Sequence, residues 1–191
     1  MKYLCLGLIF LGMAFGSSVE AKFAPGEPVP VERLLQNLGR YVQEKPKDPH
    51  GYYLLGRIHS LAFINRTRNL NALMSEEGKK ALPVLTNYQK KIRKKNDRLK
   101  AEAMRQHLSH AIQNYQIALT KDPTSGLYHI GLAYVLDKAA TFGKNMGVPP
   151  LLPTPVNLIE SKDLARYWRM KASEYYMEAY ELSLAADLKK E

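Results

Sequence analysis

The chain has little cysteine and no long hydrophobic run, and each shortage excludes a class of protein. Its only cysteine among 191 residues is Cys5. A fold held by intramolecular disulfides and a metal site built from several cysteines are therefore excluded. The longest apolar run, Tyr3–Phe15, covers about 13 residues, whereas roughly 20 are needed to cross a bilayer.

Acidic side chains are also in short supply. The chain has 18 acidic residues against 28 basic ones, which gives a net charge of +10. Such an excess attracts anionic partners in general and does not choose among acidic proteins, anionic lipids and nucleic acid. With 46% hydrophobic and 24% charged residues, the composition is that of one ordinary globular domain.

The first 21 residues have the pattern of a cleaved secretory signal. Lys2 precedes the apolar run, Gly16 to Ser18 interrupt it, and small residues surround a cleavage site after Ala21. A buried first helix and a retained membrane anchor are the alternatives. Removing residues 1–21 would leave the charge at +10, and no transmembrane segment is expected in the mature chain. The protein is therefore predicted to be exported, either to the periplasm or to the extracellular space.

Apolar residues at helical spacing and proline-containing breaks predict an all-α fold. Residues 22–30 are rich in proline and glycine and are expected to be extended. From Thr86 a strongly charged segment leads into a long helix, and Asp122 and Pro123 end it. No stretch alternates with a period of two for long enough to predict a sheet. The expected helices are 31–44, 50–63, the long helix ending at Thr120, 125–140 and 162–188.

Two segments interrupt this helical domain, which is expected to extend over residues 31–188. The first covers about 65–98 and includes a short helical stretch from Ser75 that Pro83 interrupts. The second covers about 141–160 and contains four prolines, so no helix passes through it.

The helices carry two copies of a paired pattern. Tyr52-x2-Leu55-Gly56 and Leu127-x2-Ile130-Gly131 each follow an Asp-Pro turn, and each is followed in the chain by an Ala-x3-Tyr-x2-Ala helix. Those second helices contain Ala111, Tyr115 and Ala118 in one copy and Ala172, Tyr176 and Ala179 in the other. Small residues let helices approach closely, and aromatic rings fill the larger gaps.

This pairing resembles the tetratricopeptide repeat (TPR) family, in which a helix A and a helix B form an antiparallel hairpin of about 34 residues. The resemblance covers roughly half of the chain and implies a short right-handed array of stacked hairpins. The family joins helices A and B by a tight turn, whereas this chain places an insertion between them in both copies.

The resemblance also implies a function. Helix A side chains of the family line a groove that holds a peptide or a partner helix, so the chain is expected to be an exported scaffold or adaptor that binds a protein or peptide. By position, the groove residues would be His50, Tyr53, Arg57, Ser60, Tyr128, Leu132 and Val135.

A basic segment offers an alternative function. Residues 79–100 hold nine lysines and arginines with Asp97 as their only acid. They are expected either to form a solvated surface or to bind an anionic membrane or envelope polymer. Nucleic acid is not an expected partner, since an exported protein seldom meets it. The residues that would form this anionic-surface patch are Lys90, Lys91, Arg93, Lys94, Lys95 and Arg98.

Catalytic residues, a metal site and a cofactor are not expected from the sequence. His107 and His110 lie three residues apart on one helix, but two ligands make a poor metal site and no third histidine is close in sequence. The chain has no nucleophile-elbow signature, and the glycines around Lys144 lack the spacing of a phosphate-binding loop.

Overall fold

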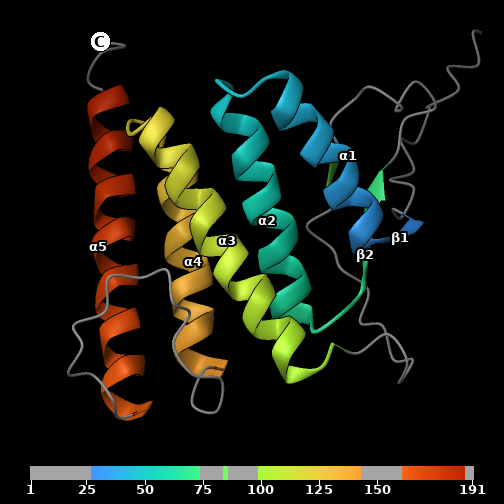
Figure 1. Cartoon of the computed structure of the whole chain (residues 1–191). Helices are drawn as coiled ribbons and strands as arrows, with labels where there is room; N and C mark the ends of the chain where they lie inside the picture. The colour runs from blue at the N-terminus through green and yellow to red at the C-terminus, as the bar shows by residue number, and fades with distance from the viewer. Residues whose placement is uncertain (1–26, 74–83, 86–98, 143–160, 188–191) are drawn as a thin grey trace, which may run out of the picture.

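The computed structural model describes residues 27–73, 84–85, 99–142 and 161–187 and shows a mainly helical protein (Figure 1). The predicted signal segment 1–21 and the anionic-surface patch lie outside these residues, as does the short helical stretch from Ser75. The described helices are α1 (Val31–Glu44), α2 (Pro49–Asn65), α3 (Ala101–Lys121), α4 (Gly126–Phe142) and α5 (Ser161–Asp187).

The turn between α1 and α2 is fixed by one carboxylate. Asp48 is the N-cap of α2, and its side chain accepts a hydrogen bond from the backbone N–H of His50 at 2.9 Å. It also accepts one from the Tyr41 hydroxyl at 2.5 Å. Pro49 follows at the first helical position, where its missing N–H costs nothing. The hydrogen bond from Tyr41 lowers the pKa of Asp48, so the carboxylate stays charged to more acidic pH.

Replacing this cap is expected to weaken the fold. Asp48→Ala should lower the free energy of unfolding by about 1 kcal/mol, the usual cost of losing a helix N-cap. Tyr41→Phe removes only the hydroxyl group that donates to Asp48 and should cost less. Urea unfolding of both variants at neutral pH measures the difference. A fully stable Asp48→Ala protein would mean that the cap contributes nothing.

The helices pack mainly with their neighbours in the sequence. The most extensive contacts are those of α2 with α3 and of α4 with α5, followed by α3 with α4 and α1 with α2. Helix α2 also contacts α4. In Figure 1, α5 lies at one edge of the molecule, and α1 lies at the opposite edge beside the strands. The small residues of the repeated pattern are buried, including Ala111 and Ala118 in α3 and Ala172 and Ala179 in α5.

The mainly helical fold agrees with the all-α class expected from the sequence, but it includes a small sheet that the sequence did not predict. Strands β1 (Glu27–Pro30), β2 (Asn69–Leu73) and β3 (Val84–Leu85) form an antiparallel sheet in the order β1-β2-β3. The strands are too short to show an alternating pattern, and β1 pairs with residues about forty positions away. Within this sheet Val29 and Leu70 are opposite each other and buried, so the sheet extends the core past α1.

Among the helices that the structure describes, none combines the length and the apolar character needed to cross a bilayer.

Candidate functional site: a pocket above Tyr115

The ring of Tyr115 in α3 lies between two glycines of neighbouring helices. A Cβ atom added to Gly56 of α2 would lie 2.9 Å from Cδ1 of this ring. One added to Gly131 of α4 would lie 2.6 Å from its Cε1. Both distances are too short for real atoms, so only glycine lets α2 and α4 approach the ring. The Leu-Gly and Ile-Gly dipeptides of the sequence pattern thus place α2, α3 and α4 around one aromatic side chain.

A pocket of about 280 Å³ opens above this ring, between α2 and α4. We refer to it as the α2–α4 pocket. Its rim on α4 is formed by large apolar side chains that are between 42% and 50% exposed. The lining residues are Tyr53, Arg57, Ser60, Leu61, Tyr115, Leu127, Ile130, Gly131 and Tyr134.

Three of the four residues predicted on α2 line this pocket. Tyr53, Arg57 and Ser60 contribute to its wall, with Tyr53 and Ser60 largely buried. His50 is not among the lining residues; it is exposed one turn away and stacks on Tyr53, with 5.7 Å between the ring centroids.

The predicted residues on α4 do not line the pocket. Leu132 and Val135 are 0% exposed in the hydrophobic core. Tyr128 is also buried and packs against Tyr53, with ring centroids 5.1 Å apart. The three side chains therefore face the core, which the sequence did not indicate because α4 is apolar on nearly every side. The α4 residues that line the pocket are Leu127, Ile130 and Tyr134.

Polar groups occupy the α2 side of the pocket, whereas the α4 side is apolar. The Arg57 guanidinium donates to the Tyr53 hydroxyl at 3.4 Å. The Ser60 hydroxyl donates to the Tyr115 hydroxyl, also at 3.4 Å. Burial raises the pKa of Tyr115, so its phenol remains neutral at physiological pH. Such a surface can bind an apolar group and orient an anionic or hydrogen-bonding group beside it.

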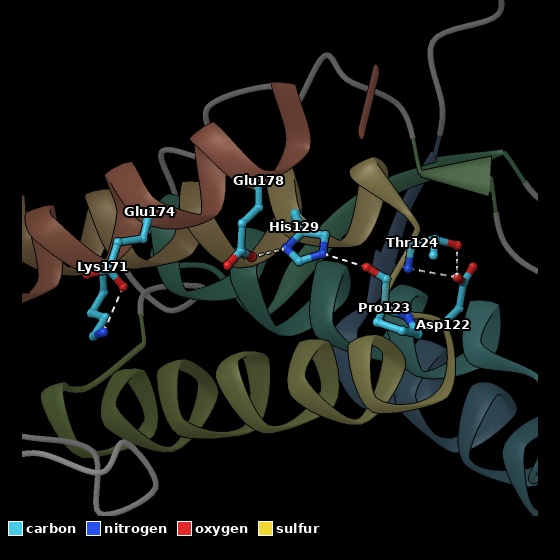
Figure 2. Close-up of polar contacts among 7 residues, drawn as sticks. All are labelled: Asp122, Pro123, Thr124, His129, Lys171, Glu174 and Glu178. Carbon is cyan, nitrogen blue, oxygen red and sulfur yellow. Dashed lines mark hydrogen bonds and ion pairs between the residues drawn. The ribbon is translucent and has the colours of Figure 1, made fainter. Parts of the chain in front are cut away.

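His129 of α4 connects the turn before this helix to α5 (Figure 2). Its Nε2 lies 2.9 Å from the carbonyl oxygen of Pro123 and donates to it, since a carbonyl only accepts. Its Nδ1 lies 2.8 Å from the carboxylate of Glu178, a contact that is an ion pair only when the imidazole is protonated. Through this contact α5 meets the start of α4, the helix that carries the apolar rim of the pocket.

A histidine cluster lies elsewhere, between α2 and α3. His59 of α2 and His107 of α3 have their Nδ1 atoms 2.8 Å apart. The His110 ring is 5.0 Å from that of His59, measured between centroids. The fold therefore supplies the third histidine that the sequence did not place near His107 and His110. In the described part of the chain, however, no three His, Cys, Asp or Glu side chains are arranged to hold a metal ion.

Burial makes His59 and His107 favour their neutral forms. Burial is the largest cause that lowers the pKa of His59 from 6.5 to about 3, and the neighbouring His107 and His110 contribute to the same shift. Burial also lowers the pKa of His107, against the opposing effect of Glu32 in α1.

Comparison with known proteins gives no match to this chain among protein-family models, curated proteins or solved structures.

Proposed function

We propose that the protein is an exported, non-catalytic binding module whose helices stack in a TPR-like array and whose α2–α4 pocket receives a protein or peptide partner. The pocket itself is the observation that carries this proposal. It combines exposed Leu127, Ile130 and Tyr134 on one wall with the Arg57 guanidinium on the other. Aromatic residues and arginine are common among the side chains that dominate binding energy at interfaces.

The arrangement of the helices supports the TPR-like part of the proposal. In such an array, a helix A packs against its own helix B and against the next helix A. Here α2 packs on α3, α4 packs on α5, and α2 also touches α4. The Tyr115 ring stands where the first helix B would meet both A helices, between Gly56 and Gly131.

The two walls also indicate the chemistry of the partner. Apolar side chains of the partner would cover Ile130 and Leu127, which removes their exposed surface from water. A carboxylate beside those side chains would pair with Arg57, which presents several N–H donors in a planar fork. We therefore infer a segment that places an acidic group next to bulky apolar residues.

Displayed random peptides provide a test that does not require the natural partner. Peptides selected on the wild-type protein should carry acidic-plus-apolar sequences. They should bind Ile130→Asp at least about tenfold more weakly, because a carboxylate then occupies the apolar wall. Arg57→Ala should weaken binding of the acidic peptides most. Fluorescence anisotropy with the selected peptides measures both losses.

The matched control is Gln113→Asp, which places the same charge on an exposed position of α3 outside the pocket. It should bind the peptides like the wild type. Binding that persists in 1 M salt would indicate the pocket as the binding site. Binding through the basic segment 79–100 would be lost, because the Debye length then falls to about 3 Å. Equal binding by Ile130→Asp and wild type would refute the pocket as the site.

A further inference from the structure

Helix α5 has an apolar face that no described element covers. The helix has 27 residues, whereas its partner α4 has 17. The side chains of Trp168, Ala172 and Ala179 are buried against the rest of the protein. Four large apolar residues project from nearly the opposite side of the helix and are between 46% and 58% exposed, namely Met170, Met177, Tyr180 and Leu184.

These residues follow a heptad spacing. Met170, Met177 and Leu184 are separated by seven positions each, which makes them equivalent a positions. Tyr180 lies at a d position, and the exposed Ser173 occupies the preceding d position. A seam with this spacing is the surface through which two helices supercoil around each other.

Charges beside the seam favour a second α5 helix in the same direction. In a parallel pair, a g residue of one helix faces the e residue five positions later in the other. Arg169 is at g and Glu174 is at the following e. The Glu174 carboxylate accepts a hydrogen bond from Lys171 of its own helix at 2.7 Å but is 47% exposed, so Arg169 of a second helix can also reach it. Tyr176 and Glu181 occupy the next g and e positions. An antiparallel pair would instead bring e residues together, and Glu174 and Glu181 are both acidic.

We propose that two copies of this chain associate through their α5 helices, side by side and parallel. Met170, Met177 and Leu184 of one copy would meet the same residues of the other. Arg169 of each copy would pair with Glu174 of the other copy. This face is separate from the α2–α4 pocket, so the proposal is independent of the proposed function. The seam from Met170 to Leu184 covers only about two heptads, so the association is expected to depend on concentration.

Sedimentation velocity of the full chain tests the association. At high concentration the mass should approach twice the 21.7 kDa of one chain and should fall to that of one chain on dilution. Met177→Glu should keep the protein monomeric at concentrations where the wild type is dimeric, whereas Gln113→Glu on α3 should not. Arg169→Glu should weaken the dimer, and combining it with Glu174→Arg should restore it.

Cysteine cross-linking tests the direction of the helices. In a Cys5→Ser background, Met170→Cys, Met177→Cys and Leu184→Cys should each give a disulfide-linked dimer on mild oxidation, since equivalent a positions lie within disulfide range. Gln113→Cys should not. Circular dichroism confirms that each variant remains helical.

A chain that is monomeric at every concentration, or a dimer that Met177→Glu leaves intact, would overturn the proposal. So would cross-linking that occurs only when Met170→Cys and Leu184→Cys chains are mixed, because that result requires antiparallel helices.

Discussion

Gly131→Ala is expected to destabilise the protein by about 1 kcal/mol, although alanine is the better helix former. The added methyl would lie 2.6 Å from the Tyr115 ring, which is buried between α2 and α4. Overpacking of this kind costs about 1–3 kcal/mol and outweighs the roughly 1 kcal/mol that alanine gains in a helix. Gly56→Ala, with a contact of 2.9 Å, should lose less. Urea unfolding of the wild type, Gly56→Ala and Gly131→Ala measures the order of their free energies of unfolding.

Gly39→Ala is the matched control for this prediction. Gly39 is also inside a helix, but a Cβ added there meets no atom within 4 Å. The same substitution should therefore stabilise the protein by up to about 1 kcal/mol. Replacing Tyr115 by Leu should make Gly131→Ala less costly, because the clashing ring is gone. A Gly131→Ala protein as stable as the Gly39→Ala protein would show that the ring does not constrain the approach of α4.

Acidification from pH 7 to pH 5 is expected to remove about 2 kcal/mol of stability through His59 alone. The pKa of His59 falls from 6.5 to about 3 on folding, so below pH 6.5 the unfolded chain binds a proton that the folded chain excludes. Stability is therefore full above pH 6.5 and declines by about 1.4 kcal/mol per pH unit below it. His107, whose pKa is also lowered, acts in the same direction. Chemical denaturation at several pH values gives the slope.

The substitution His59→Leu separates this effect from other titrations. It should flatten the dependence on pH between 7 and 5, whatever its effect on stability at neutral pH. His50→Gln, at an exposed histidine of the same helix outside the cluster, should retain the wild-type slope. The Asp48 carboxylate affects stability only at more acidic pH, because its ordinary pKa is 3.8 and folding lowers that pKa further. If His59→Leu keeps the full slope, His59 is not its origin.

The sequence predicted the helices well because their ends carry local signals. Residues 31–44 are helical as expected, and the ends near Asp48-Pro49 and Asp122-Pro123 lie within one or two residues of the prediction. The caps and prolines that set these ends act over a few positions. They therefore leave a signature that does not depend on the rest of the fold.

Features that depend on distant partners were less predictable. The β1–β2 pairing joins segments on either side of an entire helical hairpin, and the contact of His59 with His107 joins residues 48 positions apart. On α4, Leu127 and Leu132 look alike in sequence, yet one is half exposed and the other is fully buried. Only the packing of the whole chain decides between them, and it buries the three residues that the sequence analysis expected in the groove on α4, namely Tyr128, Leu132 and Val135.

The two prolines of β1 disfavour pairing of a further strand with the outer side of β1. Val31, just after the strand, donates its N–H to the carbonyl of Arg68 next to β2. Because successive residues of a strand bond to opposite sides, Pro28 and Pro30 fall where the N–H would point away from β2. Proline has no N–H, so this side of the strand cannot provide the donors that a further strand needs. Concentrated solutions of the folded protein should therefore resist aggregation through this edge.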